Sequence, residues 1–293
     1  MSATVLDGKK LAEDVRARLK ERVGALAARG IVPGLAVLLV GEDPASVSYV
    51  TAKEKACAEI GIRSIDRRLP AGSSEAEIVA IVEAFNADPS VHGILVQLPL
   101  PKGVNEARVI AAISPEKDVD GFTPVNIGRM VIGEPCFLPC TPHGVIKLIE
   151  LAGVRTAGAH AVIVGRSNIV GKPLANLLVR KSINATVTVC HTGTKGLADH
   201  TRRADILIAC AGVPGLIKAD MVKAGACVID IGITRVDDPS KAKGWRLAGD
   251  VDYESVLEVA GALTPVPGGV GPMTITMLLY NTVESAEKDA KGN

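Results

Sequence analysis

The chain has 293 residues, with a formal net charge of +1, 47% hydrophobic residues and 22% charged residues. This length is sufficient for two ordinary domains, and the near-neutral charge excludes general electrostatic attraction to nucleic acid or anionic lipid. The longest apolar runs fall far short of the ~20 residues of a membrane helix, and no signal peptide is evident. We therefore expect a cytoplasmic protein with no membrane or nucleic-acid partner.

The first half of the chain alternates helix-like and strand-like segments, a pattern typical of parallel α/β structure. In chain order we expect a helix over about 8–28, a strand over 33–41, a helix that begins at 43–44, a strand over 63–69, a helix over 73–88, a strand over 92–98 and a helix over about 105–113. Asp43 and Pro44 favour the helix start, as N-cap and first-turn residues. The segment 114–144 is rich in proline and glycine and predicts loops and a domain junction.

The same alternation restarts at His160. The elements expected here are strands around 162–164 and over 185–191, 205–211 and 226–232, a helix to about 180, a short helix over 219–223 and a long amphipathic C-terminal helix. We therefore predict an α/β protein of two α/β domains. Residues 1–139 with the C-terminal helix 273–293 form the first, and residues 140–272 form a Rossmann-like domain.

A glycine-rich segment, GRSNIVGKP, connects the strand around 162–164 to the following helix. A tight glycine turn at such a junction lets backbone N–H groups face a phosphate. The fingerprint G-x-G-x-x-G is imperfect, because Ser167 replaces the middle glycine and the last glycine, Gly171, comes one residue late. From these residues alone, dinucleotide binding by Gly165, Arg166, Ser167 and Gly171 and a purely structural turn both stay open.

The next predicted strand distinguishes NAD from NADP. An NAD-binding unit carries an acidic residue near the end of this strand, which holds the ribose 2′-hydroxyl. Here the strand ends at Cys190, His191 and Thr192 without an acid, whereas Arg166 and the hydroxyls of Ser167 and Thr192 suit a 2′-phosphate. The pattern favours NADP. The plainer interpretations are a solvated loop charge for Arg166 and a packed strand-end residue for His191.

The second predicted helix carries Tyr49 and Lys53, four residues apart and hence on one face. On a helical wheel Lys53 projects between the apolar Cys57 and Ile60, whereas Lys55 lies on the polar face. A desolvated lysine has a lowered pKa and can exchange protons near neutrality. The alternative is a lysine whose stem only covers apolar surface. The pair precedes the glycine turn, which excludes the arrangement of short-chain dehydrogenases.

Two further polar groups belong to the same predicted domain. Gln97 stands at the carboxyl end of an apolar strand, where open α/β sheets bind ligands, and it needs a hydrogen-bond partner there. KDVDGF places Asp118 and Asp120 in an irregular loop before Gly121, where a simple turn role is the alternative for Asp120. A calcium loop is excluded because its twelfth position is Arg129.

The six cysteines lack paired spacing. Those at 190, 210 and 227 lie in or beside apolar strand-like runs, so we expect buried free thiols in a reducing cytosol. CFLPCTPH (136–143) offers two cysteines and a histidine at roughly metal-ligand spacing. It lacks a fourth ligand and contains two prolines, so we expect no metal site.

Several long segments together resemble the bifunctional methylenetetrahydrofolate dehydrogenase/methenyltetrahydrofolate cyclohydrolase family. They are VGEDPASVSYVTAKEKACAEIGI, GILVQLPLP, PEKDVDGFTPVNIGR, PCTPHG, VIVGRSNIVGKP and TPVPGGVGPMTITML, in the family's order and over essentially the whole chain. The resemblance implies oxidation of 5,10-methylenetetrahydrofolate to the 5,10-methenyl form with NADP⁺, and hydrolysis of that form to 10-formyltetrahydrofolate. It also implies one active-site cleft between the two domains, and a homodimer.

The resemblance further implies roles for individual residues. Lys53 matches the catalytic lysine, Gln97 the glutamine that tunes it, and Tyr49 the tyrosine that positions the folate ring. Asp120 matches the aspartate that grips the pterin. The other matches shape the pterin and nicotinamide pocket (Pro267, Gly268, Gly271) or bind the cofactor (Gly165, Arg166, Ser167, Gly171, Thr192, Ile233).

Two other functions stay open at this point. One is another two-domain NADP dehydrogenase, of the shikimate dehydrogenase kind, which also pairs a lysine with an aspartate. The other is a folate- or nucleotide-binding module without catalysis. Binding alone would not require Lys53 together with Gln97 and Asp120, which argues against the second alternative.

Overall fold

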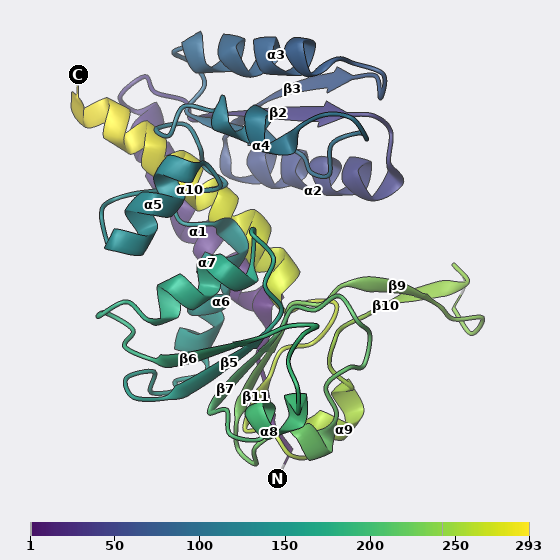
Figure 1. Cartoon of the computed structure of the whole chain (residues 1–293). Helices are drawn as coiled ribbons and strands as arrows, with labels where there is room; N and C mark the ends of the chain where they lie inside the picture. The colour runs from purple at the N-terminus through teal and green to yellow at the C-terminus, as the bar shows by residue number, and fades with distance from the viewer. Residues whose placement is uncertain (1, 242, 293) are drawn as a thin grey trace. The chain divides into compact units, whose positions relative to one another are not determined.

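The computed structural model describes residues 2–241 and 243–292, which divide into two compact units (Figure 1). One comprises Glu13–Cys140 and the chain from Ile275 onward, and we call it the three-stranded unit after its sheet. The other comprises the N-terminal segment to Ala12 and Thr141–Thr274, and we call it the six-stranded unit. Within the described residues, no helix is long and apolar enough to cross a membrane.

The three-stranded unit is built on a parallel sheet in the order β3-β2-β4. The central strand, β2 (Gly34–Val40), is buried at every position, which explains why its sequence is continuously apolar instead of alternating. The other elements are β3 (Arg63–Leu69), β4 (Gly93–Val96), α2 (Pro44–Ile60), α3 (Glu75–Ala87), α4 (Glu106–Ala111), α5 (Pro124–Ile132) and most of α1 (Gly8–Ala27) and α10 (Val270–Gly292).

Helices cover both faces of this sheet. The face of β2 that carries Ala36, Leu38 and Val40 packs against buried residues of α3 and α4. Because successive side chains of a strand point to opposite faces, the other face is left for α2, which lies across the sheet from α3 in Figure 1. The helix that carries Tyr49 and Lys53 is therefore supported by a fully buried strand.

In the six-stranded unit all strands of the main sheet pair in parallel, in the order β1-β11-β8-β7-β5-β6. The chain runs from β5 to β6 on one side and then returns to β7 on the other side of β5. Such a reversal creates a ligand crevice at the carboxyl ends of the two strands that flank it, here β5 and β7. The elements are β1 (Thr4–Val5), α6 (Cys140–Leu151), β5 (His160–Val164), α7 (Gly171–Leu178), β6 (Thr186–Cys190), α8 (Leu197–Thr201), β7 (Ile206–Ala209), the 3₁₀ helix η1 (Ala219–Met221), β8 (Cys227–Asp230), α9 (Tyr253–Leu257) and β11 (Ala262–Leu263).

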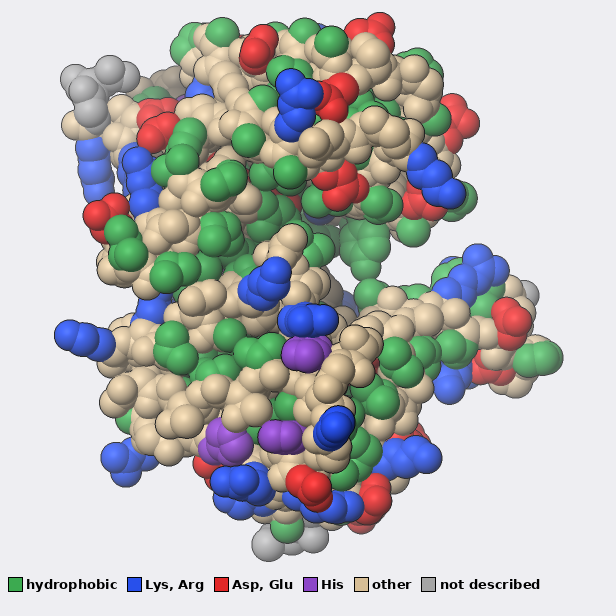
Figure 2. All heavy atoms as spheres, viewed as in Figure 1, with side chains coloured by type: hydrophobic (Ala, Val, Ile, Leu, Met, Phe, Trp, Pro, Cys, Tyr) green, Lys and Arg blue, Asp and Glu red, His purple; other side chains and the backbone are tan. Residues whose placement is uncertain are grey.

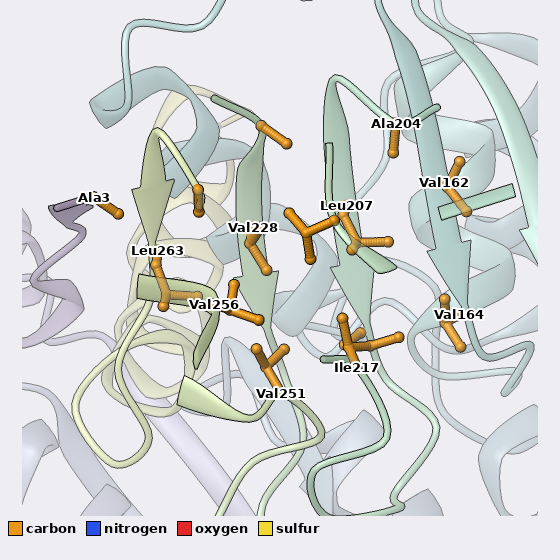
Figure 3. Packing of buried hydrophobic residues seen from close by; sticks show 14 of the residues in the cluster. Ala3, Val162, Val164, Ala204, Leu207, Ile217, Val228, Val251, Val256 and Leu263 are labelled. Carbon is orange, nitrogen blue, oxygen red and sulfur yellow. The ribbon is translucent and has the colours of Figure 1, made fainter. Parts of the chain in front are cut away.

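The core of this unit is formed by side chains of neighbouring strands (Figure 3). Val164, Leu207, Val228 and Leu263 come from four different strands and lie in one cluster of buried aliphatic and small residues. Val251, from the segment between β8 and α9, joins the same cluster. Aromatic residues make up only 2% of the chain, and the aliphatic core follows from that composition.

The first strand departs from the expected domain boundary. The sequence pattern predicts that residues 1–139 belong to one domain, but the segment to Ala12 belongs to the six-stranded unit. The reason is that β1 pairs with β11, with Thr4 opposite Ala262, and so forms an edge strand of that sheet. A strand of two residues carries no periodicity from which to predict this pairing. The other boundary falls at Thr274, close to the expected position 272.

An antiparallel hairpin of β9 (Thr234–Asp237) and β10 (Trp245–Ala248) extends from the six-stranded unit (Figure 1). Its surface carries side chains of both charges (Figure 2). The Arg235 guanidinium lies 4.5 Å from the centre of the Trp245 ring, and this cation–π contact joins the two strands on one face.

Candidate active site

Helix α2 starts where the sequence predicts. The Asp43 carboxylate accepts a hydrogen bond of 2.8 Å from the Ser46 backbone N–H, and Pro44 occupies the first turn. At the other end Gly61 has φ of 87°, a left-handed conformation in which a glycine ends a helix at little cost. These two caps fix the length of the helix and hence the positions of its side chains.

Lys53 is held by Gln97. The Lys53 Nζ donates a hydrogen bond of 3.0 Å to Gln97 Oε1. Burial lowers the pKa of Lys53 from its ordinary value, while the negative charge of Asp120 acts in the opposite direction. Lys55, two residues away, is exposed. The expected contrast between an inward Lys53 and a solvated Lys55 is therefore confirmed.

Gln97 follows β4 directly, and both halves of its amide are engaged. Its Nε2 donates to the Leu98 carbonyl at 2.7 Å, which leaves Oε1 to accept from Lys53. Its backbone N–H bonds the Leu38 carbonyl of β2 at 2.9 Å. The partner that the sequence requires for this glutamine is thus Lys53, and the sheet itself sets the position of the amide.

Asp120 provides an acidic group beside Lys53. Burial raises the pKa of Asp120 to about 6, and the nearby charge of Lys53 opposes that rise. The Cys140 thiol lies within hydrogen-bonding reach of the Asp120 carboxyl and also donates to the Val119 carbonyl at 3.3 Å. Sequence reasoning considered this segment for its metal-ligand spacing and for its resemblance to the family, and neither identified Cys140 as a neighbour of Asp120.

Asp118 has a different role from Asp120. It is 1% exposed, and its carboxylate accepts hydrogen bonds from the backbone N–H groups of Gly121, Phe122 and Thr123 and from Asn126 Nδ2, at 2.8–3.1 Å. The four bonds fold the loop that follows Asp120 onto the start of α5. Asp118 is therefore a structural residue that shapes the loop.

Replacing Asp118 by alanine should lower the free energy of unfolding by about 3 kcal/mol, because several buried donors lose a charged acceptor at once. Urea unfolding followed by circular dichroism measures the change. The matched control is Glu116→Ala: its side chain is exposed, and its substitution should change stability by less than about 0.5 kcal/mol. Equal stabilities of the two variants would contradict the structural role of Asp118.

Tyr49 lies on the same helix as Lys53, with 40% of its surface exposed. Burial of the remainder raises the pKa of its hydroxyl. In the part of the chain that the structure describes, no side-chain hydrogen bond of Tyr49 is present. Its ring and hydroxyl are thus available to a ligand.

At the glycine turn of the six-stranded unit, backbone segments come very close to one another. Gly165 has φ of 136°, and a Cβ there would collide with the Cys210 carbonyl after β7. A Cβ on Gly171, the first residue of α7, would collide with the Gly165 carbonyl. Both positions therefore require glycine, whereas Arg166 and Ser167 between them are exposed.

The end of β6 fits a phosphorylated ribose. Cys190, His191 and Thr192 bring no acid to this position, and the Thr192 side chain is exposed. His191 is engaged in a turn: its backbone N–H bonds Thr194 Oγ1 at 2.9 Å, and its Nδ1 accepts from the Gly193 N–H at 3.0 Å. The structure thus supports the packed interpretation of His191. The tight turn and the acid-free strand end are the features that a bound NADP requires.

A third loop, before α10, contains Pro267 and Gly268, and Gly271 is the second residue of α10. The Val266–Pro267 peptide bond is cis, and Gly268 has φ of 108°. The Gly268 carbonyl accepts from the Lys9 N–H at 2.9 Å, which ties the loop to the start of α1. A Cβ on Gly271 would meet open space, so packing within the chain does not explain this glycine. Ile233, in the loop after β8, is 47% exposed.

The sequence-predicted site residues fall into two groups. Tyr49, Lys53, Gln97 and Asp120 belong to the three-stranded unit, whereas the cofactor-loop and proline–glycine-loop residues belong to the six-stranded unit. A glycine turn of the dinucleotide-binding kind in one α/β unit and a half-buried lysine in another are the attributes of a two-domain α/β dehydrogenase with its own acid–base group.

Comparison with known proteins specifies this class further. Residues 6–120 match the model of the tetrahydrofolate dehydrogenase/cyclohydrolase catalytic domain, and residues 139–290 match that of the family's NAD(P)-binding domain. The bifunctional protein FolD of Moorella thermoacetica is 57% identical over 288 residues, which cover 98% of this chain and 100% of the relative. The chain belongs to the tetrahydrofolate dehydrogenase/cyclohydrolase family.

Solved structures agree with this assignment. The crystal structure of the bifunctional FolD enzyme of Campylobacter jejuni matches with a TM-score of 0.94 and 47% identity, over 98% of this chain and 100% of that one. The Trypanosoma brucei enzyme, complexed with NADP cofactor and an inhibitor, matches with a TM-score of 0.95 and 39% identity, over 99% of both chains.

Family membership decides between the functions that the sequence left open. The chain is a bifunctional enzyme that oxidises 5,10-methylenetetrahydrofolate with NADP⁺ and hydrolyses the methenyl product to 10-formyltetrahydrofolate. The shikimate dehydrogenase kind and the non-catalytic binding module are thereby excluded. The prediction of two α/β domains with a Rossmann-like dinucleotide-binding sheet is confirmed.

Proposed function

We propose that Tyr49, Lys53, Gln97 and Asp120 form the folate side of one active site and that the loops of the six-stranded unit form its cofactor side. The observation that carries the proposal is the hydrogen bond from the half-buried Lys53 to Gln97, with Asp120 close enough to influence the lysine's charge. Residues 13–140 and the C-terminal helix would then be the folate-binding part, and residues 141–274 the NADP-binding part.

In the dehydrogenase reaction, a hydride leaves the methylene carbon, and the resulting methenyl cation is stabilised by its two flanking nitrogens. NADP⁺, when bound, accepts this hydride. The chain therefore has to align the folate rather than supply a strong acid or base. The Tyr49 ring would stack on the folate, the Asp120 carboxylate would accept hydrogen bonds from pterin N–H groups, and Gly268 and Gly271 would let the loop approach both reactants closely.

In the cyclohydrolase reaction, water adds to the methenyl carbon and gives up a proton. Neutral Lys53 would accept this proton and then deliver it to N5 as the carbon–N5 bond breaks, while the remaining proton of the added water leaves to solvent and the formyl group stays on N10. A depressed lysine pKa suits this role, because an ammonium beside the cationic substrate would be repelled and could not act as a base. Gln97 would hold the amine in place through both of its charge states.

One assay tests the enzymatic assignment as a whole. Purified protein is mixed with methylenetetrahydrofolate and either NADP⁺ or NAD⁺, and the absorbances of the reduced cofactor and of the methenyl form are followed. Reduction with NADP⁺ and decay of added methenyltetrahydrofolate are both expected. Reduction without that decay would leave only the dehydrogenase, and neither signal would overturn the assignment.

Arg166 gives a more specific test of cofactor choice. Arg166→Ala should raise the KM for NADP⁺ by about 10–100-fold, because one charge-assisted contact to the 2′-phosphate is lost. The KM for NAD⁺, which lacks this phosphate, should be unchanged. The control is Arg155→Ala, an exposed arginine of the same unit. Equal changes in both KM values would show that Arg166 does not recognise the 2′-phosphate.

A homodimer and a cytoplasmic location complete the proposal. The first rests on the resemblance to the family and the second on free cysteines within the described residues, which suit a reducing compartment. Sedimentation at working concentration tests the dimer, and fractionation of cells that express the protein tests its location.

A further inference from the structure

A second pair of carboxylates belongs to the six-stranded unit, whereas the folate-side residues belong to the three-stranded unit. Asp250 is fully buried, and its Oδ2 accepts hydrogen bonds from the backbone N–H groups of Ala211 and Gly212 at 2.5 and 2.9 Å. Among the described residues, its Oδ1 has no hydrogen-bond partner. Burying a carboxylate oxygen without a partner is unfavourable, so its retention indicates a role that stability alone does not explain.

Asp230, the last residue of β8, is tied to the same place. It is 3% exposed, and its Oδ1 accepts from the N–H groups of Gly232 and Asp250 at 2.9 and 3.0 Å. Its Oδ2 accepts from the Val251 N–H at 2.9 Å, and its own N–H bonds Thr264 Oγ1 at 2.7 Å. Burial raises the pKa of Asp230 to about 6, and the charge of Asp250 contributes to the rise.

Two glycines make room for these carboxylates. A Cβ on Gly232 would collide with Asp250 Oδ1, and a Cβ on Gly249 would collide with Asp230 Oδ2. Neither glycine has a positive φ, so close approach of the carboxylates, and not backbone conformation, excludes a side chain at both positions.

The segment that carries Asp250 is anchored in the core. Val251 packs beside Ile217 in the cluster of Figure 3. The Asp250 carbonyl accepts from the Ile217 N–H at 2.9 Å, and the Ile217 carbonyl accepts from the Asp252 N–H at 2.8 Å. Asp250 therefore connects a rigid core segment to the loop that follows β7.

These contacts converge on the predicted cofactor crevice. The loop 210–212 follows β7 and meets Gly165 of the glycine turn at the crevice, while the loop 231–233 follows β8 and carries Ile233. We propose that Asp250, supported by Asp230, is a positioning residue that holds the loops after β7 and β8 in the arrangement that binds the nicotinamide end of NADP⁺. The inference rests on the proposed cofactor side of the active site and assigns a role to two residues outside the predicted set.

The test compares Asp250→Ala with Asp250→Asn. Asparagine keeps an oxygen that can accept from Ala211 and Gly212, whereas alanine removes it. Alanine should raise the KM and the calorimetric Kd for NADP⁺ by at least about tenfold, with the cyclohydrolase kcat within about twofold of wild type. Asparagine should restore the Kd to within about threefold. The matched control is Asp205→Asn, an aspartate that accepts a hydrogen bond from the His160 N–H at the amino end of β7, whereas the loop 210–212 follows the carboxyl end of this strand.

Two results would overturn the inference: an unchanged Kd for NADP⁺ in folded Asp250→Ala, or equal losses of both activities, which mark a general structural defect. If Asp250→Ala does not fold, Gly212→Ala replaces it, because Gly212 is exposed with φ of 71° and a Cβ there disturbs only the loop. An unchanged Kd in that variant also overturns the inference.

The Arg166→Ala variant separates failure of this inference from failure of the proposed function. If Arg166→Ala also leaves NADP⁺ binding unchanged, the proposed cofactor side is wrong; if Arg166→Ala weakens NADP⁺ binding, only the role of Asp250 is wrong.

Discussion

Lys53→Met should lower the cyclohydrolase kcat by about 10²–10⁴-fold, the range expected when a positioned acid–base group is lost. The Lys53 amine is 3.0 Å from Gln97 Oε1, and burial lowers its pKa, which favours the neutral amine that would take a proton from water. Methionine keeps an unbranched apolar side chain of similar length, and the packing of α2 should therefore survive. The decay of methenyltetrahydrofolate absorbance without added cofactor measures the effect.

Lys55→Met is the matched control for this variant. Lys55 lies on the same helix, two residues away, but it is exposed. Its substitution should leave both activities at the wild-type level. In Lys53→Met the dehydrogenase should fall less than the cyclohydrolase, because hydride transfer depends on alignment more than on proton transfer. A folded Lys53→Met enzyme with full cyclohydrolase activity shows that the assignment of Lys53 is wrong.

Local signals in the sequence were sufficient to predict the elements that position this lysine. Asp43 and Pro44 start α2, and the contrast between Lys53 and Lys55 follows from a period of 3.6 residues. A glutamine in an apolar strand requires a partner, but the sequence does not say which one. The bond between Gln97 and Lys53 depends on the pairing of β2 with β4 and on the packing of α2, both of which are tertiary.

The features that the sequence did not predict are those that depend on distant parts of the chain. β1 is an edge strand only because β11, more than two hundred residues later, offers it an edge. Asp230 and Asp250 are separated by twenty residues, and both look like ordinary strand-end acids. A signal did exist, since Gly232 follows Asp230 by two residues and Gly249 directly precedes Asp250. That signal cannot be interpreted from the sequence, because it depends on the packing of each glycine against the other residue's carboxylate in the folded chain.

The largest effect on both activities together is expected from Asp120→Asn. Asparagine preserves the shape of the side chain but removes the charge that would accept hydrogen bonds from the pterin. Losing a charged acceptor costs about 1.5–3 kcal/mol, or roughly 10–100-fold in kcat/KM for methylenetetrahydrofolate and for methenyltetrahydrofolate. Initial rates at low substrate measure both values. Glu116→Gln, an exposed acid of the same loop, is the control and should match wild type.

The pH dependence provides an independent test of the same residue. Burial raises the pKa of Asp120 to about 6, so the carboxylate that we propose to bind the pterin is present above this pH and is protonated below it. In wild type, kcat/KM for the folate should therefore fall as the pH decreases through about 6. Asp120→Asn should lack this acidic limb, and a limb that persists in the variant would assign the titration to another group.

Lys53 and Asp120 should also be linked in the pH profile. The positive charge of Lys53 holds the pKa of Asp120 down, and the negative charge of Asp120 holds the pKa of Lys53 up. Removing the lysine charge must therefore raise the pKa of Asp120 further. In Lys53→Met, the acidic limb of the dehydrogenase kcat/KM should move to higher pH than in wild type. A limb that does not move would mean that the two charges do not interact in the working enzyme, and that proton transfer and pterin binding are independent functions of this site.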